Sequence, residues 1–291
     1  MHDPHPLPAV SELLRPGVDD ALSVSVVRHG AGAGLPVVAL HGLPGDATST
    51  FSDVARDLEH HHRVVAPDLL GLGRSSRPAD VSVPAQAAAV GLLLDRLGAD
   101  RVALLSHGLG GLVATLVAAE EPRRVAALVL SGCDPHADAW PPPPLVPLLL
   151  PGLGRLVATA LHARPDLARR ALVAASGGPG ALSERQLDHL ERELSAPGAW
   201  RSLRDVVRAV DPVRAETAWR RLCVRPEPAP VLVLWGAQDQ VLSPASGRRT
   251  AAEHGDAVFV DVQDAGHGLP WQRSERVAEE VRGFLAERVP A

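Results

Sequence analysis

The sequence predicts an α/β domain built on a doubly wound, mostly parallel sheet, and three observations support this. Short runs of Val, Leu and Ala alternate with segments of helical periodicity along most of the 291 residues, which favours parallel strands joined by helices. The apolar runs contain few polar positions, as is typical of strands covered by helices on both faces. Alternation fails only between Asp134 and Pro228. A chain of this length fits one such domain with an insertion better than two independent domains.

The pattern of apolar residues predicts seven strands. Ala21–Arg28 alternates apolar and polar residues, as a half-buried strand does. Six further strands are predicted from short apolar runs: Leu35–Leu40, Val64–Ala66, Arg101–Leu105, Val125–Leu130, Pro230–Leu234 and Ala257–Val262. The first 20 residues are rich in proline, and we expect them to be irregular apart from one short helix around Val10–Leu14.

Helices are predicted between these strands, where apolar residues recur at i, i+3 and i+4. The segments are Thr48–His60, Pro84–Leu97, Leu109–Glu120, Pro244–His254 and Ser274–Glu287. Residues 134–228 open with four prolines at 141–144 and continue with helices rich in Arg, Leu and Ala. We interpret this segment as a helical cap, or lid, that divides the core into residues 1–133 and 229–291.

Composition excludes several classes of function. The formal net charge of −5 provides no basic field for nucleic acid. All 29 basic residues are arginine, so a lysine Schiff base is excluded. The two cysteines, Cys133 and Cys223, match no disulfide framework or zinc motif, and Cys133 is expected to be a small buried hydrophobe.

Neither a secretory leader nor a spanning segment is predicted. The first residues lack a charged region followed by an apolar one. The longest apolar run, Leu145–Ala163, is broken by prolines, glycines and Arg155, and a membrane span needs roughly 20 apolar residues. We therefore expect a cytoplasmic protein whose partner is a small-molecule substrate, not nucleic acid or a membrane, and we leave a homodimer open.

Five sequence motifs follow predicted strands. They are H-G-L-P-G at 41–45, A-P-D-L-L-G-L-G-R-S at 66–75, S-H-G-L-G-G at 106–111, W-G-A-Q-D-Q-V-L-S-P at 235–244 and D-A-G-H-G-L-P at 264–270. In this order and context they resemble the α/β-hydrolase superfamily, in the branch with an H-G-x-P turn and a helical cap after the sixth strand. The resemblance covers nearly the whole chain outside the cap and the first 20 residues, and it implies an eight-stranded sheet.

The resemblance also implies a catalytic triad with its reacting member missing. The family carries its nucleophile in G-x-S-x-G, on a tight turn from strand to helix, followed in the chain by an acid and a histidine. Aligned to that pattern, Ser106 takes the first glycine position, Gly108 the nucleophile and Gly110 the closing glycine. Asp239 matches the acid and His267 the general base.

Gly108 decides the chemistry. The turn forces its central residue into a strained conformation that glycine adopts freely. No acyl-enzyme can form on a residue without a side chain. Ser106, at the end of the preceding strand, is the less favoured alternative nucleophile because reach and orientation toward His267 are strict.

Other residues near the motifs are candidates for supporting roles. By resemblance, the oxyanion hole uses the backbone amides of Leu43 and Leu109. Asp134 is the second candidate for the acid, while His41 and His107 are expected to brace loops.

Two further sets of residues have a composition that could serve binding. Asp134, His136 and Asp138 are spaced like a metal set, but the simpler reading is a solvated turn, so we expect neither metal nor cofactor. Trp140, Trp200 and Trp219 either line a ligand cavity or join the cap to the core.

These residues predict an enzyme that works without a covalent intermediate. His267, oriented by Asp239, would act as a general base on an apolar small molecule, polyketide-like or aromatic, in a lyase, cyclase, isomerase or cofactor-free oxygenase reaction or in direct hydrolysis by water. One alternative is a non-catalytic ligand-binding pseudohydrolase. Another is a serine hydrolase whose nucleophile is Ser106 or whose serine has been replaced at position 108.

Overall fold

The computed structural model describes residues 11–14, 22–30, 32–150, 152–176 and 178–289. Eight strands form one sheet in the order β1-β2-β4-β3-β5-β6-β7-β8. Strands β1 and β2 pair antiparallel with their neighbours, and the other pairs are parallel. The strands are β1 (Ser11–Leu14), β2 (Val24–His29), β3 (Gly34–Leu40), β4 (His62–Pro67), β5 (Val102–His107), β6 (Val125–Ser131), β7 (Val231–Gly236) and β8 (Val258–Val262). The predicted fold class is confirmed.

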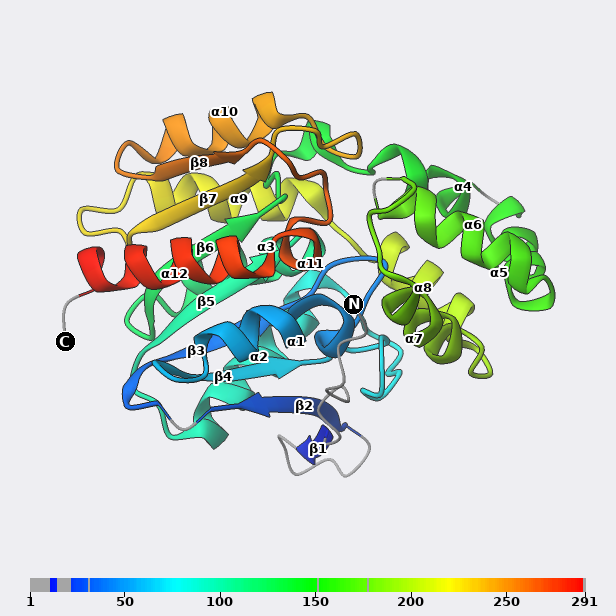
Figure 1. Ribbon diagram of the computed structural model, residues 1–291, viewed down its shortest axis with the longest axis horizontal. Coiled ribbons are helices and arrows are strands. Elements are labelled where there is room, and N and C mark those ends of the chain that lie inside the picture. The colour runs from blue at the N-terminus through cyan, green and yellow to red at the C-terminus, as the bar shows by residue number, and fades with distance from the viewer. Residues whose placement is uncertain (1–10, 15–21, 31, 151, 177, 290–291) are drawn as a thin grey trace.

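Helices cover both faces of this sheet (Figure 1). One layer contains α1 (Ala47–Leu58), α11 (Leu269–Gln272) and α12 (Ser274–Arg288), and the other contains α2 (Val83–Leu97), α3 (Leu109–Glu120), α9 (Pro212–Cys223) and α10 (Pro244–His254). Each layer packs its own cluster of buried Val, Leu and Ala against one sheet face. The continuous apolar runs of the central strands follow from this double coverage.

The expected short helix near the N-terminus is wrong. Ser11–Leu14 form strand β1, which pairs antiparallel with β2, and Val10 lies outside the described residues. This strand is held by backbone hydrogen bonds to a partner strand ten or more residues further along the chain. A local hydrophobic pattern carries no information on such a pairing.

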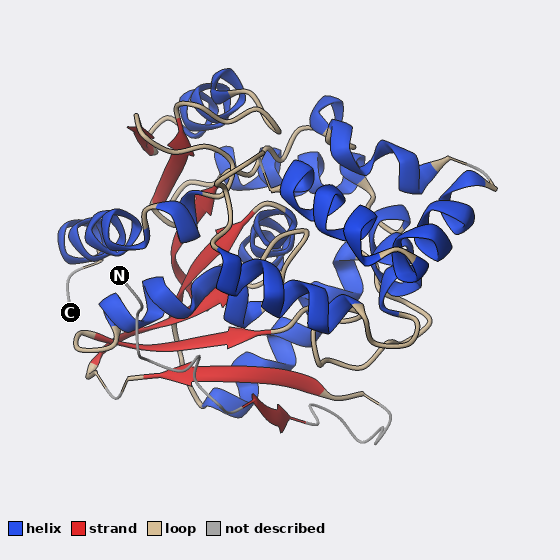
Figure 2. Cartoon of the chain, turned by 45° about the vertical axis from the view of Figure 1, so that its right-hand side comes forward, coloured by secondary structure: helices blue, strands red, loops and turns tan. Residues whose placement is uncertain are grey.

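Between β6 and β7 the described residues form helices and irregular segments, and no strand. The helices are η1 (Ala137–Ala139), η2 (Pro143–Leu145), α4 (Val146–Leu149), α5 (Leu153–Ala163), α6 (Pro165–Ala175), α7 (Glu184–Leu194), α8 (Ala199–Arg208) and α9. Helices α4 to α8 form a lobe beside the core (Figures 1 and 2). Helix α9 instead packs against α3, and its Trp219 is fully buried. The outer lobe is therefore shorter than the predicted segment 134–228.

The parallel strands direct their carboxyl ends to one edge of the sheet, and the loops that follow β3, β5, β6, β7 and β8 meet there. Ligand sites of open α/β sheets lie at this edge. The cap lobe is inserted after β6, so it adjoins the same loops.

Candidate active site

The turn after β5 has the geometry of a nucleophile elbow. Gly108 joins β5 to α3 with φ +50° and ψ −120°, a conformation that side-chain-bearing residues rarely adopt. Its N–H donates to the carbonyl of Ser131 at 3.1 Å. A β-carbon at Gly110 would lie 2.0 Å from the carbonyl oxygen of Leu40, so this second glycine lets α3 approach β3. The turn keeps its shape with a bare α-carbon at its tip.

Space beside that α-carbon is open toward His267. A β-carbon at Gly108 would lie 3.6 Å from the α-carbon of Gly42 and 4.0 Å from Nε2 of His267, both ordinary contacts. A hydroxyl one bond further out could therefore reach the imidazole. The site has room for a nucleophile that this chain does not carry.

His267 is oriented by Asp239. The Nδ1 of His267 lies 2.9 Å from Oδ2 of Asp239, and both side chains are buried. The other carboxylate oxygen accepts the backbone N–H groups of Val241 at 2.8 Å and Leu242 at 2.9 Å. Because the carboxylate accepts the Nδ1 proton, Nε2 is left with a lone pair directed toward Gly108.

Two neighbouring histidines have different tasks. His107 is fully buried, its ring centroid lies 5.0 Å from that of His267, and its Nδ1–H donates to the carbonyl of Ser131 at 3.1 Å. Burial is the main cause that holds the pKa of His107 well below its usual range, and electrostatic repulsion between its ring and that of His267 adds to it. His41 donates through Nδ1 to the carbonyl of Gly42 and accepts the N–H of Leu69 at Nε2, each at 2.9 Å. It braces the loops after β3 and β4.

Ser106 points away from this group. Its hydroxyl donates to the carbonyl of Val129 on β6 at 2.7 Å, and the residue is fully buried in the sheet. Among the described residues, no hydrogen bond joins Ser106 to His267. The geometry therefore disfavours Ser106 as a nucleophile.

A cavity of about 40 Å³ opens at Gly108. One water needs roughly 10–15 Å³ of such volume, so the space suits a few waters or a small reacting group. Its walls include Leu43, Leu109 and His267. Leu109 is the first residue of α3, whose leading N–H groups have no acceptor within the helix. The predicted oxyanion donors thus belong to residues on the wall of this cavity.

A second, apolar chamber of about 350 Å³ adjoins the first and shares Leu43, Pro144 and Leu145 with it. Residues from α4, α5, α6 and α8 complete its wall, and none of its lining side chains is charged. Trp140 lines the first cavity and Trp200 the second, whereas Trp219 belongs to the core. The three tryptophans therefore divide between the two roles that the sequence left open.

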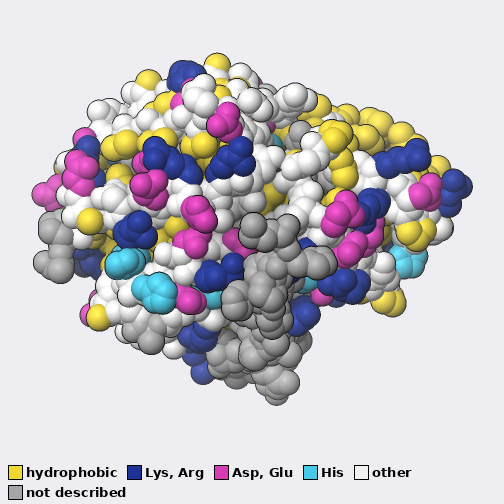
Figure 3. Space-filling view, in the orientation of Figure 1, with side chains coloured by type: hydrophobic (Ala, Val, Ile, Leu, Met, Phe, Trp, Pro, Cys, Tyr) yellow, Lys and Arg dark blue, Asp and Glu magenta, His cyan; other side chains and the backbone are white. Residues whose placement is uncertain are grey.

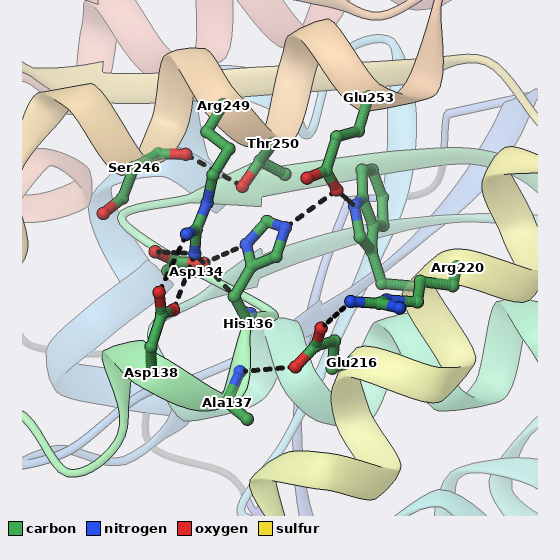
Figure 4. Close-up of polar contacts among 11 residues, drawn as sticks. Asp134, His136, Ala137, Asp138, Glu216, Arg220, Ser246, Arg249, Thr250 and Glu253 are labelled. Carbon is green, nitrogen blue, oxygen red and sulfur yellow. Dashed lines mark hydrogen bonds and ion pairs between the residues drawn. The ribbon is translucent and has the colours of Figure 1, made fainter.

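Asp134 does not contact His267; it belongs to a separate polar network (Figure 4). Its Oδ1 lies 2.5 Å from Nδ1 of His136, whose Nε2 lies 2.8 Å from Glu253. Burial opposes ionisation of Asp134, but the hydrogen bonds from His136 outweigh it, so the pKa of Asp134 is lowered. Asp138 turns to the guanidinium of Arg249 instead, at 2.8 Å.

This network does not form a metal site. Within the described ranges, no group of three His, Cys, Asp or Glu side chains is placed to hold a metal ion. Cys133 is buried at the wall of the first cavity, and burial raises the pKa of its thiol.

Sequence reasoning missed two features of the site. Gly132, after β6, has φ +51°, and a β-carbon there would lie 3.3 Å from Nδ1 of His267, so its lack of a side chain leaves room for the imidazole. The only signal was the S-G-C-D that ends the strand. His189 of the cap lies 2.6 Å from Asp46 of the core, and no sequence pattern indicated this pair.

The comparisons with known proteins agree with this fold. A family model described as alpha/beta hydrolase fold matches residues 36–274. Lipase LipV of Mycobacterium tuberculosis is 31% identical over 291 residues, covering 92% of this chain and 99% of that protein. The uncharacterized protein Rv2715 of the same organism is 30% identical over 283 residues, covering 90% and 78%. The solved structure of epoxide hydrolase CorEH has a TM-score of 0.78 at 21% identity, covering 96% of this chain and 99% of that one.

Proposed function

The chain belongs to the α/β-hydrolase family, and we propose that it is an enzyme of that family which works without a covalent intermediate. One observation carries the proposal. Nε2 of His267, whose Nδ1 is held by Asp239, faces a bare α-carbon at Gly108 across an open contact. A base is in place where a nucleophile is absent. Retained orientation of the base is what a non-covalent proton transfer requires.

The proposed chemistry is general-base catalysis with electrostatic support. In direct hydrolysis, Nε2 of His267 takes a proton from water as its oxygen attacks the substrate carbonyl, and the imidazolium then returns the proton to the leaving group. The N–H groups of Leu43 and Leu109 hold the oxyanion between these steps. With an acidic C–H substrate, the same base removes the proton and the same amides hold the enolate, which suits a lyase, cyclase or isomerase.

These two contributions are large enough to support an enzyme. A positioned general base contributes typically about 10²–10⁴-fold in rate, and one oxyanion donor about 10²–10³-fold. The 350 Å³ chamber favours a substrate with a sizeable apolar part, because it offers no charged lining group. We propose an apolar small molecule with a carbonyl or an acidic C–H as the substrate class.

The experiment uses a serine-directed fluorophosphonate probe and a panel of p-nitrophenyl esters. We expect no labelling of the wild-type chain, and labelling at position 108 in Gly108→Ser. Any turnover of the activated esters by the wild type should fall about 10²–10⁴-fold in His267→Ala. Ser106→Ala is the matched control and should change neither readout.

Two outcomes would contradict the proposal. Labelling of wild-type Ser106 would restore a covalent mechanism. Unchanged turnover in His267→Ala would leave the histidine without a catalytic role and favour the ligand-binding alternative.

A further inference from the structure

Exposed apolar side chains gather on the cap. In the described part of the chain, seven large hydrophobic residues are exposed, and five of them lie between residues 146 and 167. They are Val146 (39%), Leu150 (43%), Leu153 (44%), Leu156 (67%) and Leu167 (42%). Figure 3 shows hydrophobic side chains gathered over the same region, at its upper right. Such a concentration on one element group marks an interaction surface more often than chance exposure does.

A basic groove adjoins this surface. Its volume is about 460 Å³, and its lining residues include Arg155, His162, Arg201 and Arg204 but no carboxylate. Arg204 pairs with its neighbour Asp205. Within the described ranges, the guanidinium groups of Arg155 and Arg201 make no hydrogen bond or ion pair, so both can bind an anion.

Helix α5 carries both features. Arg155, Thr159 and His162 face the groove at helical spacing. Leu153 and Leu156 are the exposed apolar residues of the same helix. Residues 146–175 carry four arginines against a single aspartate, although the whole chain has a net charge of −5. Two of these arginines are paired, Arg164 with Asp166 and Arg169 with carboxylates of α7. The basic character of this apolar surface therefore comes from Arg155 and Arg170, together with Arg201 of the groove.

We propose that this surface of α4, α5 and α6, with the adjoining groove wall of α8, docks on an anionic phospholipid surface. The exposed leucines would enter the boundary between headgroups and acyl chains, while Arg155 and Arg201 bind lipid phosphates. Apolar residues beside arginines are the combination that holds peripheral helices at such a boundary. The proposal reverses the expectation, drawn from the sequence, of a protein without a membrane partner.

The contact that we propose lies at the surface of the bilayer. No single helix in the described ranges is long and apolar enough to span a membrane. The helical segments Pro143–Leu149 and Leu153–Ala163, bent by 109° at the break between them, are together as long and as apolar as a span.

The apolar chamber adjoins this surface and shares residues with it. Leu167 is exposed and also lines the chamber. Val157 and Ala160 of α5 line the chamber too. Trp200 forms part of both the groove wall and the chamber wall. An apolar substrate dissolved in lipid would therefore meet the chamber where the cap meets the bilayer.

The experiment is co-sedimentation of the full chain with vesicles of phosphatidylglycerol or of phosphatidylcholine. We expect binding to the anionic vesicles that weakens with added salt, and little binding to the neutral ones. The charge reversal R155E/R201E should lower the partition coefficient at least about tenfold, and L153S/L156S should lower it on both vesicle types.

Matched controls keep the result specific. Val213 and Val224 are as exposed as Leu156 but lie outside the cap lobe, so V213S/V224S should bind as the wild type does. Arg221→Glu is the corresponding charge control on α9. Unchanged melting temperatures would show that every variant is folded.

Three results would overturn the proposal. One is absence of binding to phosphatidylglycerol. Another is an equal loss in the control variants. The third is a dimer in light scattering that disappears in L153S/L156S without any vesicle binding, which would make the occupant a second copy of the chain. His267→Ala should bind vesicles normally, so this test is independent of the catalytic proposal.

Discussion

Gly108 combines a backbone requirement with a chemical consequence. Its φ of +50° is strained for any residue with a side chain, yet the space beside it would admit one. Among described residues, positive φ occurs only at glycines. The chain therefore gains backbone relief at this turn at the cost of a nucleophile.

The relief can be measured. We expect Gly108→Ala and Gly108→Ser each to lower the free energy of unfolding by about 1–3 kcal/mol, because each forces a side chain into this backbone conformation. Urea denaturation of both variants checks this. The alanine variant carries the strain without the hydroxyl, so it should not react with the fluorophosphonate probe. Equal stability of all three proteins would show that the turn relaxes.

Asp239 sets the tautomer of His267, and its replacement should separate geometry from charge. Asn at this position can still accept from Val241 and Leu242, but its amide would face Nδ1 of His267. The imidazole would then carry its proton on Nε2, so Nε2 would have no lone pair with which to act as the base. We expect turnover to fall about 10²–10⁴-fold, with little change in melting temperature.

The double variant Asp239→Asn/His267→Ala checks that the two residues act as one unit. It should be no slower than His267→Ala alone. A multiplied loss would show that Asp239 acts independently of the histidine.

At the scale of single elements, a helix or strand could be predicted when the contacts that stabilise it are local in the sequence. Helices α3 and α10 begin and end at the predicted residues, because the residues that flank them, Gly108 before α3 and Ser243 and Gly255 around α10, are local signals in the sequence. Strand β1 was missed because it depends on a partner strand. The placement of α9 against α3 was missed because helical periodicity does not reveal which surface a helix covers.

A buried polar pair, together with a hydrogen bond from Gln186 to the carbonyl of Ser49, joins helix α7 of the cap to the core. Nε2 of His189 lies 2.6 Å from Oδ2 of Asp46, the N-cap of α1. Burial opposes the charge on each group, but their mutual hydrogen bond outweighs it. The pKa of His189 is therefore raised above 6.5 and that of Asp46 lowered below 3.8. More weakly, Glu193 raises and Arg192 lowers the pKa of His189.

The sign of the pH dependence follows from these shifts. The stability from His189 is fully present below pH 6.5 and is lost as pH rises through its raised pKa. The stability from Asp46 is present above pH 3.8 and is lost as pH falls through its lowered pKa. The pair should stabilise the docked cap most in the interval between these two values.

His189→Gln isolates this effect. We expect the melting-temperature advantage of the wild type over this variant to be largest in mildly acidic buffer and to shrink as the pH rises above 6.5. Other histidines also make the stability depend on pH, since the pKa of His136 is raised and those of His29 and His254 are lowered. The wild type and the variant share these histidines, so the difference between their melting temperatures reports on His189. An advantage that grew with pH would contradict the pairing.

At the scale of the whole molecule, the site was predictable wherever topology alone brings residues together. The motif loops meet because parallel strands end at one edge, so Leu43, Gly108 and His267 could be placed from sequence order. The chamber could not be predicted. It depends on the packing of α5, α6 and α8 over the core, and the helical patterns of the cap do not specify their mutual orientation.

The chamber should select ligands by apolar length, which can be tested without knowing the reaction. Each buried methylene contributes about 0.8 kcal/mol, so the dissociation constant of straight-chain carboxylates should fall about three- to fourfold per added methylene until the chamber is full. Ala171 lines the chamber, and Ala171→Phe should end this gain at a shorter chain. Calorimetric titration of a carboxylate series measures both.

Ala252→Phe, on an exposed position of α10, is the matched control and should follow the wild type. Affinity that does not depend on chain length in the wild type would mean that the ligand does not enter the chamber. A gain that continues unchanged in Ala171→Phe would place the apolar chain elsewhere. Either result would separate the chamber from the cavity at Gly108, and the substrate would then have to fit the smaller space of about 40 Å³ alone.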